Sequence, residues 1–87
     1  MYVIQADIKY DNEDKAITRY AGIDQFLFRP TWYEGIDDNP AFFNTLEEAT
    51  AWWLDNKRLL RKCRYDMDIT NPKIVEVTYT TVRNLSI

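Results

Sequence analysis

Hydrophobic and polar residues alternate along the first ten positions of the chain. One face of an extended segment would carry Tyr2, Ile4, Ala6, Ile8 and Tyr10, and the opposite face would carry Gln5, Asp7 and Lys9. This period of two predicts a strand over residues 2–10 that is buried on one side. Residues 11–15 are mainly charged and polar and predict a hairpin loop. Residues 16–21 are then expected to return as a second strand, which Gly22 ends.

The next stretch is less regular. Residues 25–29 predict a short third strand closed by Pro30, but the apolar positions do not separate into two faces, so its pairing stays open. Residues 30–43 contain two prolines, one glycine and an Asp-Asp-Asn cluster, and they follow neither the helical nor the strand period. We expect a long loop there, and long loops in small domains are often functional.

The clearest element is a helix that begins after Thr45. The hydroxyl of Thr45 and the carboxylate of Glu48 have the spacing of a capping box. Acidic residues in the first turn and basic residues in the last turn suit the helix dipole. One broad apolar stripe follows at helical spacing, made of Leu46, Ala49, Trp52, Trp53, Leu59, Leu60 and Cys63.

A polar connection over residues 65–71 is expected to end at Pro72, and residues 73–82 alternate as a final strand rich in Val and Thr. The order is strand, strand, strand, helix, strand, with no repeat and no linker. We therefore predict one domain over residues 1–87 with an α+β fold. In this fold one amphipathic helix packs on a mainly antiparallel sheet of three to four strands, giving two layers.

The composition of the chain limits the kinds of catalytic and metal site that it can form. The 87 residues include one cysteine and no histidine, so an internal disulfide, the usual zinc ligands and the usual general base are missing. Two isolated glycines do not form a phosphate-binding loop. We expect no catalytic residue, no cofactor and no metal, and hence no enzyme. With no apolar span and no leader pattern, we expect a cytoplasmic protein. A core this small leaves homodimerisation open.

Two clusters of carboxylates are candidate magnesium or calcium sites: Glu34 with Asp37 and Asp38, and Asp66 with Asp68. Neither has the glycine and terminal glutamate of a calcium loop, and such pairs often arise by chance. Cys63 lies among basic residues that would lower a thiol pKa, but a small structural side chain is the better interpretation.

The charges are unevenly distributed. Residues 1–55 carry 11 acidic and four basic side chains, whereas residues 56–87 carry three acidic and seven basic ones. The basic cluster at the helix end consists of Lys57, Arg58, Arg61, Lys62 and Arg64. It suits a solvated helix end, and it also suits a phosphate-binding face with Tyr65 as a stacking surface. The net charge of −3 favours the solvated helix end.

The predicted long loop places aromatic rings beside carboxylates. Its candidate protein contacts are Trp32, Tyr33, Glu34, Asp37 and Asp38. Aromatic anchors ringed by charge are typical of protein interfaces. The same residues also fit a second interpretation, in which Trp32 covers one end of the core and the acids face solvent.

The element order resembles that of the short accessory proteins encoded by bacteriophages. The segments that carry the resemblance are Tyr2-Val3-Ile4 at the start, Phe43 to Ala49 before the helix, and Pro72 to Val77 in the last strand. The resemblance implies a protein that acts without catalysis by binding and blocking or redirecting a host enzyme, RNA polymerase, nuclease or defence system. It transfers no functional residue.

The leading hypothesis is therefore a small interaction protein that binds and inhibits or modulates a larger host or cellular protein. Mimicry of nucleic acid by the acidic half is one mode of that binding. The alternative is a nucleic-acid-binding module that uses the basic end of the helix.

Overall fold

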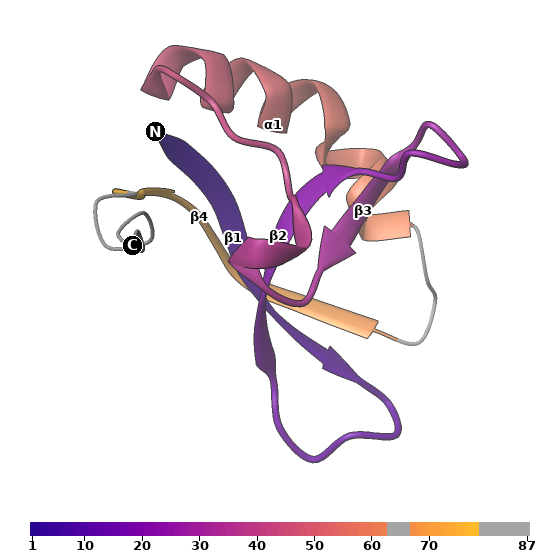
Figure 1. The fold of residues 1–87 in the computed structure, drawn as a ribbon. Coiled ribbons are helices and arrows are strands. Elements are labelled where there is room, and N and C mark those ends of the chain that lie inside the picture. Colours follow the sequence, from indigo (N-terminus) through magenta and orange to yellow (C-terminus); the bar gives the residue numbers. More distant parts are fainter. Residues whose placement is uncertain (63–66, 79–87) are drawn as a thin grey trace, which may run out of the picture.

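The computed structural model describes residues 1–62 and 67–78 and shows an α+β fold (Figure 1). The elements in chain order are β1 (Tyr2–Tyr10), β2 (Ile17–Ile23), β3 (Pro30–Tyr33), the 3₁₀ helix η1 (Ile36–Asp38), α1 (Leu46–Lys62) and β4 (Met67–Glu76). The strands form one antiparallel sheet in the order β3-β2-β1-β4, and α1 lies across one face of it. The predicted fold class and element order are confirmed.

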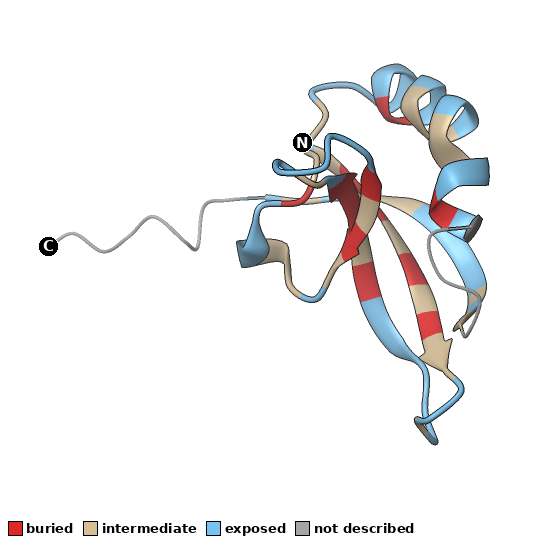
Figure 2. Cartoon of the chain, turned by 90° about the vertical axis from the view of Figure 1, so that its right-hand side faces the viewer, coloured by how far each residue is buried: buried red, intermediate tan, exposed pale blue. Residues whose placement is uncertain are grey.

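The core lies between β1 and α1. Ile4, Ala6 and Ile8 of β1 are at most 1% exposed, as the alternation predicted, and they cluster with Leu60 of the helix. Figure 2 shows the same alternation as buried and half-buried bands along the strands, with the outer side of the helix exposed. Val3 is also fully buried, although the alternation places it on the opposite, polar face of β1. Burial of apolar surface, mainly between the sheet and α1, is the main stabilising contribution in so short a chain.

Helix α1 begins as predicted, because the backbone N–H of Glu48 donates to Thr45 Oγ1 at 3.1 Å. Its predicted apolar stripe is only partly correct. Ala49 and Leu60 are buried, and the two tryptophans are half-buried, whereas Leu46 and Leu59 are 48% and 54% exposed. A helix on a small twisted sheet buries only the residues along its line of contact. Cys63 lies outside the described residues.

Strand β2 continues through Gly22, so the prediction that this glycine ends it was wrong. The reason is a close approach of the segment after η1. A Cβ at position 22 would lie 2.7 Å from Tyr33 Cε2 and 3.0 Å from Pro40 Cα. In that segment the N–H of Ala41 donates to Ala21 O at 3.0 Å. Glycine is needed here because the two backbones lie against each other.

The third strand is displaced from its predicted position. Residues 25–29 form a turn, and β3 occupies Pro30–Tyr33 inside the predicted loop, paired with β2 from Tyr20↔Tyr33 to Ile23↔Pro30. Pro30 is tolerated because it is the first residue of an edge strand. The remainder of the predicted loop contains η1 and a segment whose Phe43 pairs with Tyr2.

The last strand also starts earlier than predicted. Residues 67–71 were expected to be part of a polar connection, but they pair with β1 from Tyr10↔Met67 to Asp7↔Thr70. The register then shifts near Asn71, which has φ 55°. Pro72, expected at the end of the connection, instead lies inside an irregular edge strand. Residues 79–82 of the predicted strand lie outside the described residues.

In the described part of the chain, no helix has both the length and the apolar character needed to cross a membrane.

Candidate functional site

The connection between β2 and β3 is a closed turn, referred to below as the 24–29 turn. The N–H of Asp24 donates to the carbonyl of Arg29 at 2.9 Å, and the N–H of Phe28 donates to the carbonyl of Asp24 at 2.8 Å. These two bonds close a hairpin over four residues, 25–28, which projects beyond the ends of β2 and β3 (Figure 1). The turn is therefore held by its own backbone.

The side chain of Asp24 adds a second set of bonds. Its Oδ1 atom accepts from the N–H of Phe26 at 2.8 Å and of Leu27 at 2.9 Å. Hydrogen bonds from the backbone N–H of Leu27 and then of Phe26 hold the pKa of Asp24 below its usual value. Desolvation opposes this shift, and the charge of Arg29 lowers the pKa by a smaller amount. An aspartate at this place is typical of turns in which the side chain satisfies backbone donors.

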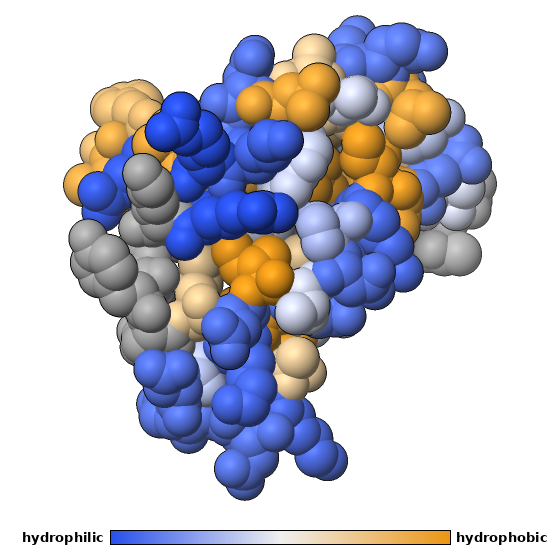
Figure 3. All heavy atoms as spheres, turned by 180° about the vertical axis from the view of Figure 1, so that it is seen from behind, coloured by the Kyte–Doolittle hydropathy of each residue, from blue (hydrophilic) through white to orange (hydrophobic). Residues whose placement is uncertain are grey.

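This well-bonded turn exposes its apolar side chains. Phe26 is 91% exposed, Leu27 58% and Phe28 82%. Figure 3 shows apolar surface at its left-hand edge, on the side of the molecule where the turn lies. Single exposed apolar residues are ordinary, but three in succession, two of them aromatic, form a contiguous exposed apolar patch of the kind found at interaction sites.

Phe28 also has a strained backbone. Its φ is 53°, in the left-handed region that glycine and asparagine adopt readily and that bulky residues rarely adopt. Glycine or asparagine at this position would form the same turn at lower conformational cost. Because Phe28 is 82% exposed, packing against the described residues does not explain why phenylalanine is there. Strain of this kind points to a function for the side chain.

A hollow of about 360 Å³ separates the 24–29 turn from the segment around η1. Its lining includes Asp24, Gln25 and Phe26 from the turn and Tyr33, Asp38 and Asn39 from β3 and beyond. The hydroxyl of Tyr33 donates to the carbonyl of Ile23 at 2.7 Å, which fixes the ring at the wall of the hollow.

The five predicted protein contacts do not form one exposed loop. Trp32 is only 9% exposed and belongs to the core cluster, whereas Tyr33 is half-buried. Glu34, Asp37 and Asp38 are exposed in and before η1. The structure thus brings Tyr33 and Asp38 together in the lining of the hollow and buries Trp32 in the core cluster.

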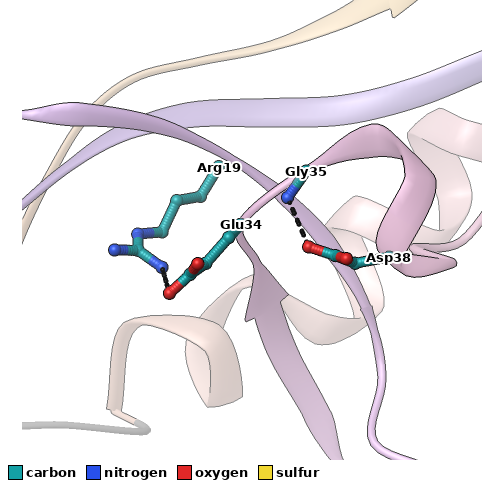
Figure 4. Close-up of polar contacts among 4 residues, drawn as sticks. All are labelled: Arg19, Glu34, Gly35 and Asp38. Atoms are coloured by element: carbon teal, nitrogen blue, oxygen red, sulfur yellow. Dashed lines mark hydrogen bonds and ion pairs between the residues drawn. The ribbon is translucent and has the colours of Figure 1, made fainter.

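Two polar contacts order the segment that leads into η1 (Figure 4). Arg19 of β2 pairs with Glu34 through Nη1 and Oε1 at 3.3 Å, and its guanidinium lies 5.2 Å from the ring centre of Tyr10. The backbone N–H of Gly35 donates to Asp38 Oδ2 at 2.9 Å. The carboxylate of Asp38 is therefore fixed in direction, as that of Asp24 is.

The basic cluster at the end of α1 is only partly described. Arg58 and Arg61 are exposed, and Lys57 is half-buried. The Lys62 side chain, Arg64 and Tyr65 lie outside what the structure describes. The described members are compatible with both the solvated helix end and the phosphate-binding face.

No group of three or more His, Cys, Asp and Glu side chains that could hold a metal ion occurs among residues 1–62 and 67–78. Asp66 of the second candidate carboxylate pair lies outside those ranges, so that pair stays untested.

Sequence reasoning missed the 24–29 turn as a site. The available signal was the failure of Phe26, Leu27 and Phe28 to alternate, which argued against a half-buried strand. Asp24 and Pro30 flank this run as turn-forming residues usually do.

The comparisons with known proteins identify no relative: no family model matches, and no curated protein or solved structure shows significant similarity to the chain.

Proposed function

We propose that this protein is a non-enzymatic interaction protein that binds a larger cellular protein and inhibits or modulates it, with the 24–29 turn as its principal contact. The observation that carries the proposal is the exposure of Phe26 and Phe28 in a turn whose backbone is fully closed and, at Phe28, strained. The proposal agrees in kind with the resemblance to bacteriophage accessory proteins and adds a specific surface.

An apolar turn closed by its own hydrogen bonds is suited to insertion into a cleft. Large side chains near the centre of an interface contribute most of the binding energy, and a fixed loop loses little conformational entropy on binding. Blocking a cleft that a substrate or subunit uses is a direct route to inhibition. Tyr33, Glu34, Asp37 and Asp38 would then form the polar rim, while Trp32 supports β3 from the core.

The test is affinity capture of the tagged protein from a bacterial lysate, with and without nuclease and at low and high salt. The double variant Phe26→Ser/Phe28→Asn is compared with Leu54→Ser, which removes a 58% exposed leucine from α1. We expect one dominant protein that survives nuclease and salt, is retained by Leu54→Ser and is lost from the double variant.

Three outcomes would overturn the proposal. Equal capture by both variants would remove the turn from the interface. Recovery that disappears with nuclease or salt would favour nucleic acid at the basic end of α1. Binding of the wild type, but not of the double variant, to phosphatidylcholine vesicles in place of a protein would assign the apolar turn to a lipid surface.

A further inference from the structure

The hollow beside the apolar turn combines two kinds of wall. Phe26 and Tyr33 contribute aromatic rings, whereas Asp24 and Asp38 contribute carboxylates. Ring faces attract cations, and carboxylates pair with them, so the combination is suited to a cationic side chain. A planar guanidinium uses both, because it stacks on rings and donates several hydrogen bonds in its plane.

Both carboxylates are oriented yet keep acceptor capacity. Asp24 accepts its two backbone bonds through Oδ1, and Asp38 accepts its bond from Gly35 through Oδ2. Within the described residues neither carboxylate forms an ion pair, in contrast to Glu34, which is paired with Arg19. The second oxygen of each carboxylate is available to a ligand, and the backbone bonds hold both groups in place before binding.

The amide side chains of Gln25 and Asn39 complete the lining. Their carbonyl oxygens accept hydrogen bonds, and the five N–H groups of a guanidinium exceed what two carboxylate oxygens can accept. The compact ammonium of lysine has fewer donors and stacks less well on rings. The donor count therefore favours arginine.

The charges of the surrounding segment also favour a cationic ligand. The segment from residue 24 to residue 39 contains four acidic side chains and one basic side chain. An acidic surface around an apolar turn disfavours approach to phosphate-rich surfaces and favours a positively charged rim on the partner.

We infer that the hollow between Phe26, Tyr33, Asp24 and Asp38 receives an arginine side chain of the partner protein, so that the partner presents an apolar cleft with a basic rim. This inference rests on the proposed function and specifies the chemistry of the partner.

The test uses a defined probe and needs no partner. Backbone amide NMR spectra of the ¹⁵N-labelled protein are recorded during titration with N-acetyl-arginine amide, with the uncharged isostere N-acetyl-citrulline amide as the control ligand. We expect millimolar binding of the arginine probe with shifts concentrated at Phe26, Tyr33 and Asn39, and no saturable shifts with the citrulline probe.

Neutral variants then locate the charge requirement. Asp24→Asn and Asp38→Asn each keep an oxygen for their backbone bonds and lose the charge. We expect each to weaken the arginine probe about two- to fivefold, the range for a single solvent-accessible ion pair. Asp37→Asn is the matched control, because Asp37 is an exposed carboxylate one residue from Asp38 that does not line the hollow.

Equal shifts with arginine and citrulline would overturn the inference, and so would equal weakening by Asp37→Asn and Asp38→Asn. Phe28→Asn separates this inference from the proposed function. Phe28 does not line the hollow, so its loss should leave the arginine probe unaffected while abolishing partner capture. Capture that needs Phe28, in a protein that does not bind the arginine probe, would sustain the function and refute the inference.

Discussion

Replacing Phe28 tests whether the exposed turn exists for binding rather than for folding. Phe28→Asn removes the ring and places a residue that tolerates the left-handed conformation at φ 53°. Phe28→Ala removes the ring but keeps the strain. The two variants therefore differ in backbone strain while both lose the same aromatic side chain.

The expected magnitudes follow from exposure. Phe28 is 82% exposed, so less than about a fifth of an aromatic residue's surface of roughly 150–250 Å² is buried. At about 25 cal/mol per Å², loss of that contact lowers the free energy of unfolding by no more than about 1 kcal/mol. In the asparagine variant, relief of the left-handed strain raises the free energy of unfolding by about 1–2 kcal/mol. We expect Phe28→Asn to be as stable as the wild type or up to about 1 kcal/mol more stable, and Phe28→Ala to be about 1 kcal/mol less stable than Phe28→Asn.

Urea denaturation followed by tryptophan fluorescence measures these differences, because the three tryptophans report on the folded state. The slope of the transition should not change between variants. A loss of more than about 2 kcal/mol in both variants would mean that the ring is packed and that its strain serves the fold. Greater stability of Phe28→Ala than of Phe28→Asn would refute the strain argument.

Three further measurements probe the fold and the turn. Gly22→Ala should lower the free energy of unfolding by about 1–3 kcal/mol, because its Cβ would lie 2.7 Å from a ring carbon and 3.0 Å from backbone atoms. An unchanged urea midpoint would show that these neighbouring atoms move to accommodate the methyl group. Leu60 is fully buried, so Leu60→Ala should lower the free energy of unfolding by about 2–5 kcal/mol. Leu59 is 54% exposed, so Leu59→Ala should lower it by less than about 1 kcal/mol in the same assay. Equal losses would contradict the described orientation of the helix. The depressed pKa of Asp24 means that its support of the turn is complete above the unfolded value of 3.8 and is lost as pH falls through the lower folded value. Carboxyl ¹³C NMR should therefore show that the pKa of Asp24 lies below the ordinary value for a solvated aspartate, and an ordinary pKa would contradict the hydrogen bonds from the turn to this carboxylate.

The parts of the fold that the sequence predicted are those governed by a single local period. Strand β1 alternates between apolar and polar residues from Ile4 to Tyr10, and α1 carries its cap at Thr45 and opposite charges at its two ends. In both elements, local propensity and tertiary packing favour the same structure.

The mispredicted boundaries arise where tertiary contacts outweigh local signals. Gly22 lies within β2 because a distant backbone segment packs against it, and Pro72 lies within β4 because an edge strand does not need its N–H. The strand expected at residues 25–29 is a turn because Asp24 satisfies successive backbone donors. Neither a helical nor a strand period describes such contacts.

The sequence predicted only two of the residues that line the candidate site. The sequence pattern indicates Tyr33 and Asp38, which line the hollow, whereas it predicts a strand at Phe26 and Phe28. Periodicity does not distinguish a buried apolar run from an exposed one, because exposure depends on what the rest of the chain covers.

The most direct test of the proposed function is site-specific photo-crosslinking in bacterial cells. The residue p-benzoylphenylalanine is placed at position 28, where an 82% exposed ring tolerates added bulk, and in separate proteins at position 54 on the outer side of α1. Irradiation should yield one discrete protein adduct from position 28 and none from position 54. No adduct at position 28, or the same adduct from position 54, would contradict the assignment of the 24–29 turn as the contact surface.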